Sequence, residues 1–514
     1  MHEKYKKIPD HLPEVFISST ATTRAVGRAV KTARARKLGP RLYTANMTDQ
    51  PETIVRRNAW RITGLLMPGA VIGYRTGFEG RVPDDGSIFV VGAQRRRLNL
   101  PGLQVQMVPG PGPLAGDQPF LEGLYLASRA RAILESLKLT RQRKYASRAV
   151  SRSAIEEYLD RELRIGGAVK INRIRDDAKR LAPLLDASTA FDILDDMIGT
   201  LLGTRKARLN SPVAIARAAG TPYDPNRLDL FHKLHAELLQ WTVKSRSDRL
   251  PGESEFANVA FFDAYFSNFI EGTEFKVTEA HAIVFDGRIP PARPKDAHDI
   301  VGTYRLVGNR DWMSKGMRDM ATPDAIVARM VASHADMMAA RPDKRPGEFK
   351  TEANQAGQTL FVEPELARGT LTLGIDLARS LDTPFARAIM LMFVVSEVHP
   401  FDDGNGRVAR ALMNAELVAG GDRRILVPTV YRNDYLTGLR TLSRTAGPKA
   451  FVQVMDHAQE YTARIDFTDY DHALAVLVET DAFMEPGVRA DVTVGTETSA
   501  MAAKLRLPPP RAIT

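Results

Sequence analysis

The chain has 514 residues, of which 44% are hydrophobic and 26% are charged, so it is too long for one hydrophobic core and too apolar for a disordered or fibrous protein. The absence of cysteine excludes disulfide bonds, thiolate metal sites and a cysteine nucleophile. The net charge of +10 arises from residues 1–150, where 25 Lys and Arg oppose 11 Asp and Glu, whereas the remainder holds 46 against 50.

Residues 1–150 are expected to form a basic α+β domain. Residues 13–40 have a basic, helical pattern that stops at Gly39 and Pro40. Its basic residues cluster just before that stop, at Lys31, Arg34, Arg36 and Lys37. Strand-like segments follow between turn residues, namely RLYTA, AWRITGLLM, AVIGYRT, SIFVV, QRRRLNL and LPGLQVQMV. A local basic excess is typical of nucleic-acid binding, and a solvated basic surface is the alternative.

The rest of the chain has a mainly helical pattern. Apolar residues recur at three- and four-residue spacing in 128–137, 151–163, 191–203 and 226–241. We expect a helical connector over residues 151–220, a helical domain over 221–470, and a final helix with a mobile tail over 471–514. The longest apolar run, residues 388–395, is far shorter than the roughly 20 residues of a membrane span. No secretory signal is evident, so we expect a cytoplasmic protein without a membrane partner.

The stretch HPFDDGNGRVAR, residues 399–410, lies between two predicted helices. The second helix is expected to begin near Gly404 to Gly406 and to end at Gly420 and Gly421. The first backbone N–H groups of a helix have no internal acceptor and form an anion site. Gly404 and Gly406 let a phosphate approach the backbone closely, and Asn405 can donate from its amide.

The charged residues of this stretch fit the same chemistry. Arg407 and Arg410, three residues apart, are expected to reach polyphosphate oxygens from one helix face. Asp403 suits a divalent cation, since Mg²⁺ takes one or two carboxylates together with phosphate oxygens. His399 at the loop entrance is available as a general base, and Phe401 is expected to point inward.

At every specified position the stretch resembles the signature of the Fic (Fido) family, His-x-Phe-x-(Asp/Glu)-Gly-Asn-Gly-Arg-x-x-Arg. The resemblance implies a Fic domain over residues 221–470 that transfers AMP from ATP to a Ser, Thr or Tyr hydroxyl of a target protein and releases pyrophosphate. It implies His399 as the base, Asp403 as the ligand of Mg²⁺ or Mn²⁺, and ATP contacts from Gly404, Asn405, Gly406, Arg407 and Arg410. Gly406 favours nucleotidyl transfer over the kinase-like branch, which has lysine there. An inactive family member is the alternative.

Two further segments resemble parts of Fic proteins. Residues 346–364 are similar to the β-hairpin flap that aligns a target segment by main-chain hydrogen bonds, with a polar turn at 354–357. Phe349, Lys350 and Thr351 are the expected docking edge, and a plain surface hairpin is the alternative. The resemblance also suggests that Tyr435 borders the adenine.

A third segment resembles the family's inhibitory pattern, (Ser/Thr)-x-x-x-Glu-(Gly/Asn), at Ser267, Glu271 and Gly272. These residues end a predicted apolar helix over about 254–272. In the family the glutamate pairs with the second signature arginine, here Arg410, and takes the place of the ATP γ-phosphate. The alternative is an exposed glutamate at a helix end. In some relatives the same glutamate positions a water, so a hydrolase that removes AMP from a modified target stays open.

Residues 10–140 resemble, more loosely, the AbiEi-type antitoxin and transcriptional regulator family, with a winged helix-turn-helix followed by a small α+β domain. That resemblance implies DNA as a partner, and a module that recruits the protein target is the alternative. We therefore expect a multidomain protein with a winged-helix-like α+β domain, connecting helices and an all-α Fic domain with a β-hairpin flap. A DNA-binding autoregulator or toxin-antitoxin component whose Fic fold senses nucleotide, and transfer of phosphocholine, are competing functions. The sequence leaves the oligomeric state open, a homo-oligomer included.

Overall fold

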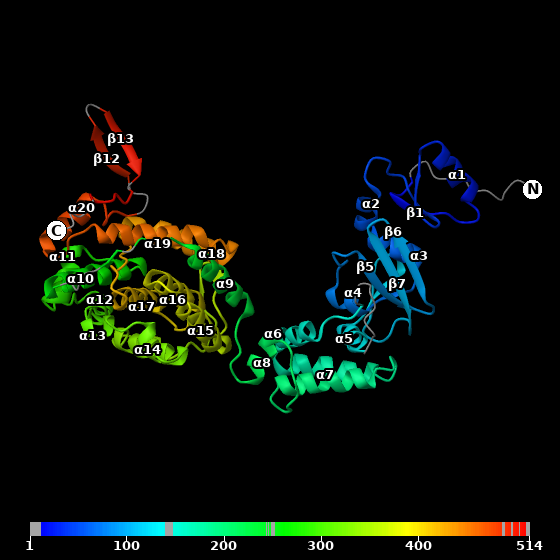
Figure 1. The fold of residues 1–514 in the computed structure, drawn as a ribbon, viewed down its shortest axis with the longest axis horizontal. Helices are drawn as coiled ribbons and strands as arrows, with labels where there is room; N and C mark the ends of the chain where they lie inside the picture. Colours follow the sequence, from blue (N-terminus) through cyan, green and yellow to red (C-terminus); the bar gives the residue numbers. More distant parts are fainter. Residues whose placement is uncertain are drawn as a thin grey trace, which may run out of the picture. The chain divides into compact units, whose positions relative to one another are not determined.

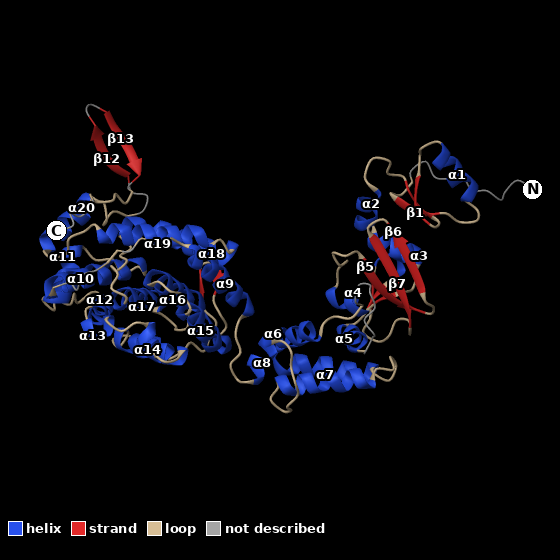
Figure 2. Cartoon of the chain, in the orientation of Figure 1, coloured by secondary structure: helices blue, strands red, loops and turns tan. Residues whose placement is uncertain are grey.

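The computed structural model describes residues 12–138, 148–242, 244, 246–247, 252–485, 489–494, 497–502 and 504–509. The chain divides into two compact units, Met1–Gly220 and Thr221–Thr514 (Figure 1). The first unit combines sheets with helices, whereas the second is built mainly of helices (Figure 2). This architecture confirms the expected multidomain, helix-rich fold with an N-terminal α+β region. Over the described ranges no helix combines the length and apolar character that a membrane span needs.

The N-terminal unit begins with a small antiparallel sheet. Its strands are β1 (Val15–Ile17), β2 (Arg36–Gly39) and β3 (Leu42–Thr44), in the order β1-β3-β2, and α1 (Thr23–Lys31) connects β1 to β2. The prediction of one helix over 13–40 was wrong at both ends. Aromatic and β-branched residues flank the helix and pair across the sheet, as where Phe16 stacks on Tyr43 at 6.0 Å between ring centroids.

A second, six-stranded sheet has the order β6-β7-β5-β4-β9-β8. Its strands are β4 (Val71–Ile72), β5 (Ser87–Gly92), β6 (Arg96–Leu100), β7 (Leu103–Pro109), β8 (Gln118–Pro119) and β9 (Tyr125–Leu126). The β5–β7 and β4–β9 pairs are parallel, and the other pairs are antiparallel. The helices of this region are α2 (Pro51–Arg57), α3 (Ala59–Leu66) and α4 (Tyr74–Glu79), with a 3-10 turn at Leu121–Gly123.

The segment AWRITGLLM, expected as a strand, forms helix α3 instead. Its buried residues include Ala59, Ile62, Thr63 and Leu66. These positions recur at three- and four-residue intervals, so a helix buries all of them on one face, which a strand with its period of two cannot do. The short apolar run alone did not distinguish the two.

Helices complete the first unit. They are α5 (Arg129–Leu137), α6 (Arg152–Leu181), α7 (Ser188–Leu201) and α8 (Pro212–Ala218). The helical runs predicted at 128–137, 151–163 and 191–203 correspond to α5, α6 and α7, and each extends one or two residues past an end of its helix. Ile133, Leu159 and Leu194 belong to the apolar core that these helices share. Gly167, at φ +62°, breaks the regular geometry inside α6.

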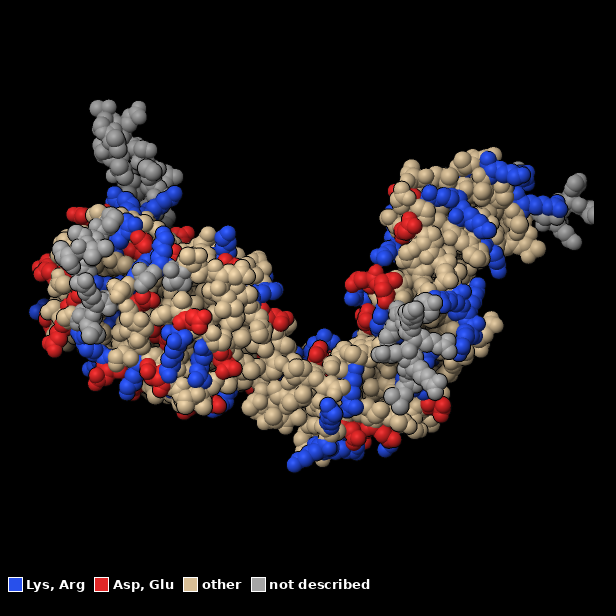
Figure 3. Space-filling model, viewed as in Figure 1, with Lys and Arg blue, Asp and Glu red and all other residues tan. Residues whose placement is uncertain are grey.

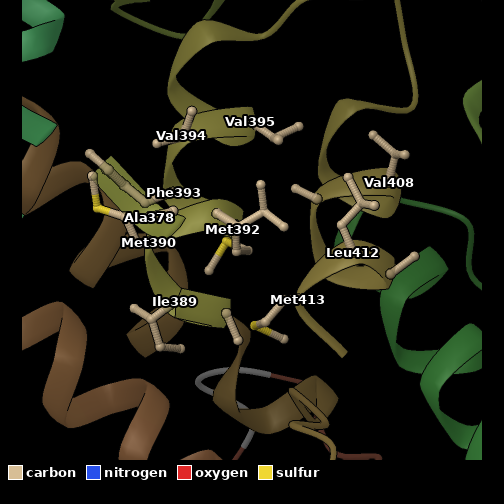
Figure 4. Close-up of a cluster of buried hydrophobic side chains, with 14 of the residues drawn as sticks. Ala378, Ile389, Met390, Met392, Phe393, Val394, Val395, Val408, Leu412 and Met413 are labelled. Atoms are coloured by element: carbon tan, nitrogen blue, oxygen red, sulfur yellow. The ribbon is translucent and has the colours of Figure 1, made fainter. Parts of the chain in front are cut away.

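The second unit is a helical domain around one central helix. Its helices are α9 (Pro225–Gln240), α10 (Glu253–Ile270), α11 (Val277–Phe285), α12 (Pro294–Val307), α13 (Arg310–Met313), α14 (Pro323–Met337), α15 (Pro364–Arg379), α16 (Pro384–Val398), α17 (Asn405–Ala419), α18 (Arg432–Thr445), α19 (Pro448–Ala463) and α20 (Tyr470–Glu479). Short 3-10 turns lie at Met317–Asp319, Pro342–Lys344 and Thr429–Tyr431. Side chains of α16 such as Met392 and Val395 pack with Val408 and Leu412 of α17 (Figure 4). Because α16 is apolar nearly all round, it is buried on every side, and it fixes where its last residue lies.

Two hairpins accompany these helices. Strands β10 (Gln355–Ala356) and β11 (Thr359–Leu360) form a short hairpin inside the segment 346–364 that resembles the flap, with its turn at 357–358 instead of 354–357. Strands β12 (Arg489–Val494) and β13 (Glu497–Ala502) pair where we expected a mobile tail. The polar and apolar residues of RADVTV alternate, as they do in a strand, whereas ETSAMA shows no such alternation. The rest of that expected tail lies partly outside the described residues, at 486–488, 495–496, 503 and 510–514.

Candidate active site

The loop between α16 and α17 brings the signature residues together. His399 caps α16 in the left-handed conformation, with φ 52° and ψ 60°. Gly404 precedes α17 at φ +74°, and a Cβ there would lie 3.0 Å from the Met338 sulfur and 3.3 Å from Nε2 of His334. Glycine is therefore required at position 404 both by the backbone angle and by the space.

The buried side chain of Asn405 holds this loop together by hydrogen bonds to the backbone of Phe401. Its Oδ1 accepts from the backbone N–H of Phe401 at 2.8 Å, and its Nδ2 donates to the carbonyl of Phe401 at 2.8 Å. Both ends of the buried amide are thus used within the protein. This differs from the expectation that the Asn405 side chain donates to a phosphate, because satisfying the buried backbone of Phe401 takes precedence. The backbone N–H groups in the first turn of α17 still have no helical acceptor.

The orientation of His399 suits a general base. Its Nδ1 lies 3.2 Å from the carbonyl oxygen of Ser396. A carbonyl only accepts, so Nδ1 carries the proton and Nε2 keeps a free lone pair. Burial lowers the pKa of His399 to about 4, and the ring is therefore neutral at physiological pH.

Arg410 is bound by the end of helix α10. Its Nε donates to Oγ of Ser267 at 3.0 Å, and its Nη2 donates to the Ser267 carbonyl at 2.9 Å and to Oε1 of Glu271 at 2.7 Å. The arginine side chain is 4% exposed and that of Glu271 is 30% exposed. Ser267 and Glu271 of the inhibitory pattern thus both contact Arg410, at a place where the guanidinium is buried and the carboxylate is partly exposed. Gly272 follows at φ +89°, which lets the chain leave α10 directly after Glu271.

The carboxylate of Glu271 also lies over the first turn of α17. A Cβ placed on Gly406 would be 2.1 Å from Oε1 of Glu271, so only glycine leaves room for this carboxylate. The N-terminal end of a helix carries partial positive charge and favours an anion there. The carboxylate of Glu271 therefore lies beside the helix end where the sequence predicts an anion site.

Arg407 has a different role from the one expected. Its Nη1 lies 3.1 Å from Oδ2 of Asp299 and donates to Asn268 at 3.5 Å. Asp299 also accepts from Nε and Nη2 of Arg341, at 3.2 and 2.6 Å. Residues three apart on a helix differ by about 60° around its axis. Arg407 reaches Asp299 of α12 as well as Asn268 of α10, whereas Arg410 binds Ser267 and Glu271 at the end of α10.

Tyr435 does not border an open base site. The side chain is buried, and its hydroxyl accepts from Nη1 of Arg410 at 3.5 Å and contacts the sulfur of Met392 at 3.5 Å. Burial raises the pKa of this phenol. The placement at the adenine is corrected: Tyr435 packs behind Arg410 and helps to hold its guanidinium.

Asp403 is the one signature carboxylate suited to a metal. Its side chain is 36% exposed, and Oδ1 accepts from the N–H of Gly404 at 2.7 Å. Within the described part of the chain, no group of three or more His, Cys, Asp or Glu could hold a metal ion. A lone carboxylate fits Mg²⁺ only when phosphate oxygens complete the coordination, which is how this ion is usually bound next to nucleotides.

The expected docking residues support the loop instead of forming an exposed strand. The N–H of Lys350 donates to the carbonyl of Pro400 at 2.8 Å, and its ammonium donates to Asn354 at 2.6 Å and to Val398 at 3.2 Å. Burial lowers the pKa of Lys350 to about 8. Phe349 stacks on Phe401 at 5.9 Å between centroids, and Thr351 is exposed. The edge strand assigned to these three residues was wrong, because their bonds go to residues 398–401.

Four residues of the site carry no signal in the signature. His334 donates from Nε2 to the carbonyl of Asp403 at 2.9 Å and accepts at Nδ1 from Gly347 at 2.9 Å. Its ring stacks on Phe401 with 3.7 Å between centroids. The other three are Asp299, Asn354 and Phe361. Asp299 lies in α12, His334 in α14, and the other two flank the hairpin, so only contacts in three dimensions reveal the group. Asn354 and Phe361 do fall within the stretch that resembles the flap.

Comparison with known proteins identifies the family. Residues 322–417 match the model of the Fic/DOC family. A Fido domain-containing protein of Dictyostelium discoideum is 32% identical over 104 residues, which make up 19% of this chain and 72% of that protein. The chain therefore belongs to the Fic/DOC family.

A curated relative and a solved structure of the same protein extend the comparison. The protein adenylyltransferase fic-1 of Caenorhabditis elegans is 26% identical over 242 residues, covering 45% of this chain and 46% of that protein. The chain thus spans about half the length of this curated relative. A solved structure of C. elegans Fic-1, residues 134–508, is 18% identical with a TM-score of 0.34, and the match covers 65% of this chain and 96% of that one.

Proposed function

We propose that the protein is an autoinhibited protein adenylyltransferase, which transfers AMP from ATP to a Ser, Thr or Tyr hydroxyl of a target protein. The observation that carries the proposal is the carboxylate of Glu271, paired with Arg410 and lying over Gly406 at the start of α17. An anion already occupies the place where a nucleotide's phosphates would bind. The curated relatives named protein adenylyltransferase supply the reaction class.

In this proposal His399 starts the reaction. Its free Nε2 accepts the proton of the target hydroxyl, whose oxygen forms a bond to the α-phosphorus of ATP. The bond from that phosphorus to the bridging oxygen breaks, and pyrophosphate leaves. The first-turn N–H groups of α17 stabilise charge on the transferred phosphoryl oxygens, as donors aimed at developing charge do in such transfers. Asp403 would hold Mg²⁺, which neutralises phosphate charge when it is bound.

Glu271 acts as the inhibitor in this scheme. While it pairs with Arg410, the terminal phosphate of ATP lacks its cation and meets a carboxylate of the same charge. Arg410 is buried and held on its other sides by Ser267 and Tyr435, so it stays in place when Glu271 leaves. Removal of one side chain should therefore open the site without rebuilding it.

The test compares labelling by the full chain and its variants with ATP that carries a label on the α-phosphate. Glu271→Gly should incorporate AMP into itself or a lysate protein, and Glu271→Gly with His399→Ala should lose at least about 100-fold of that rate. Glu274→Gly removes an exposed carboxylate just beyond α10 and serves as the matched control, which should stay as inactive as the wild type. Absence of AMP transfer by Glu271→Gly to any protein would contradict the proposal. Release of AMP from a previously modified target by the wild type would instead identify a hydrolase.

We also propose that the N-terminal unit binds nucleic acid through helix α1. Arg24, Arg28 and Lys31 are exposed and spaced by four and three residues on one face, while Val26 and Ala29 are buried on the other. Lys and Arg side chains gather over the part of this unit that carries α1 (Figure 3). A helix with three exposed basic residues on one face offers cations to a phosphate backbone.

Fluorescence anisotropy with a labelled DNA duplex at several salt concentrations tests this second function. In the full chain, Arg28→Glu with Lys31→Glu should weaken binding and reduce the slope of log affinity against log salt by about 2. Arg173→Glu with Lys179→Glu, two exposed basic residues on α6, is the matched control and should leave the slope unchanged. Equal slopes for both double variants would contradict the assignment to α1, and absence of binding by the wild type at low salt would remove the function.

A further inference from the structure

The residue that follows strand β11 touches the catalytic imidazole directly. Phe361 stacks on His399 with 3.8 Å between ring centroids and 3° between the ring planes. This is a face-to-face contact over the whole imidazole. No motif in the sequence linked the two residues, which are separated by the whole of α15 and α16.

Hydrogen bonds fix the start and end of the hairpin to the loop that carries His399. The N–H of Phe361 donates to the carbonyl of Asn354 at 3.1 Å. The side-chain amide of Asn354 then donates to the carbonyls of His399 at 3.3 Å and Phe401 at 3.0 Å. The residues on either side of β10 and β11 are thus bonded to each other and to both sides of Pro400.

A second link runs through Arg227 of α9. Its Nη1 lies 2.9 Å from Oε1 of Glu397, two residues before His399. Its Nη2 donates to the carbonyl of Leu360, the last residue of β11. The C-terminal strand of the hairpin is therefore tied both to the end of α16 and, through Phe361, to the imidazole itself.

The hydrogen bond to Ser396 and the stacked ring of Phe361 restrict different motions of the His399 imidazole. The hydrogen bond from Nδ1 to Ser396 fixes one atom of the imidazole, but it leaves the ring plane free to turn about that bond. The stacked phenyl face fixes the plane. Together they determine where the lone pair on Nε2 points, and a displacement of 1 Å in such a group can cost about 100-fold in rate.

We propose that Phe361 is a positioning residue for His399, so that the hairpin orients the base that acts on the target hydroxyl. The inference rests on the proposed adenylyltransferase function. Phe361 is only partly buried, whereas the next residue, Val362, belongs to the apolar core. Replacing Phe361 should therefore affect the imidazole more than the folding of the domain.

The first measurement follows labelling in full-length protein that carries Glu271→Gly. At saturating ATP, addition of Phe361→Ala should slow AMP incorporation about 10- to 100-fold while the affinity for ATP, measured by calorimetry, is unchanged. Phe361→Tyr keeps the ring face and should restore the rate. Phe285→Ala is the matched control, since it removes a phenylalanine beside another histidine, His281, at 4.6 Å on α11.

The second measurement does not require activity. NMR spectra of full-length protein with labelled histidine rings, with His399→Ala to identify the signal, should show His399 shifted by the ring current of the stacked phenyl group. The shift should be lost in Phe361→Ala and retained in Phe361→Tyr. An unchanged His399 signal in Phe361→Ala, or equal labelling rates with and without Phe361, would overturn the positioning role. Absence of label in the Glu271→Gly parent would instead count against the adenylyltransferase function, and the NMR result would still decide the stacking.

Discussion

The start of helix α17 and the end of helix α10 face each other across the candidate site, and they are held very differently. At the start of α17, Asn405 is bonded to Phe401 on both sides of its amide, and Arg407 is buried against Asp299. At the end of α10, Glu271 makes one ion pair and keeps 30% of its side chain exposed.

In the proposed function, this difference distinguishes the loop that would carry the reaction from the carboxylate that would inhibit it. A loop held by the buried side chains of Asn405 and Arg407 has little freedom, so its geometry exists before any ligand binds. A carboxylate at a helix end that stops at glycine has few contacts to lose. We infer that activation requires displacement of Glu271 and no rearrangement of the loop.

The largest expected effect concerns Arg407 at the start of α17 and the free energy of unfolding. Arg407→Ala leaves the buried Asp299 with only Arg341 as its partner, and breaking a buried ion pair costs roughly 3 to 5 kcal/mol. Urea unfolding should show a loss of about 3 kcal/mol or more. The matched control is Arg368→Ala, which removes an exposed pair with Asp324 and should cost less than about 1 kcal/mol. Equal losses for the two variants would show that Arg407 does not anchor the helix.

A somewhat smaller effect concerns pH. Burial lowers the pKa of folded His399 to about 4, whereas the unfolded chain binds this proton near pH 6.5. The unfolded state therefore binds more protons between these values, and the free energy of unfolding falls as the pH drops from 6.5 toward 4. Between pH 7 and 4.5 the wild type should lose about 2 kcal/mol more than His399→Asn in urea unfolding. The same pH dependence in both proteins would place His399 in a more solvated setting than the structure shows.

The smallest expected effect concerns Glu271 and the affinity for ATP. Glu271→Gly frees Arg410 and takes a negative charge from the phosphate site, so ATP should bind about tenfold more tightly, or about 1.4 kcal/mol. Isothermal titration calorimetry measures this directly. Glu274→Gly should leave the affinity of the wild type unchanged. An ATP affinity that does not respond to Glu271→Gly would mean that the ion pair with Arg410 does not compete with the nucleotide.

Local patterns were sufficient where the chemistry is carried by neighbouring residues. The apolar run before His399, the glycines at 404 and 406, and the helix that ends at Glu271 and Gly272 all predicted elements that the structure contains. They succeed because helix periodicity and glycine backbone preferences act over a few residues. The same rules failed for AWRITGLLM and for the strand expected at residues 349–351, where contacts with distant segments decided the outcome.

The sequence by itself thus determined the family signature, the helix-loop-helix that carries it, and, through the family resemblance, the pairing of Glu271 with Arg410. Only the tertiary structure decided that Arg407 turns to Asp299, that Tyr435 is buried behind Arg410, and that Phe361 covers His399. The physical reason is that each of these contacts joins elements far apart in the chain. Which way a side chain points then depends on how whole helices pack, and the spacing of residues along the sequence does not predict that packing.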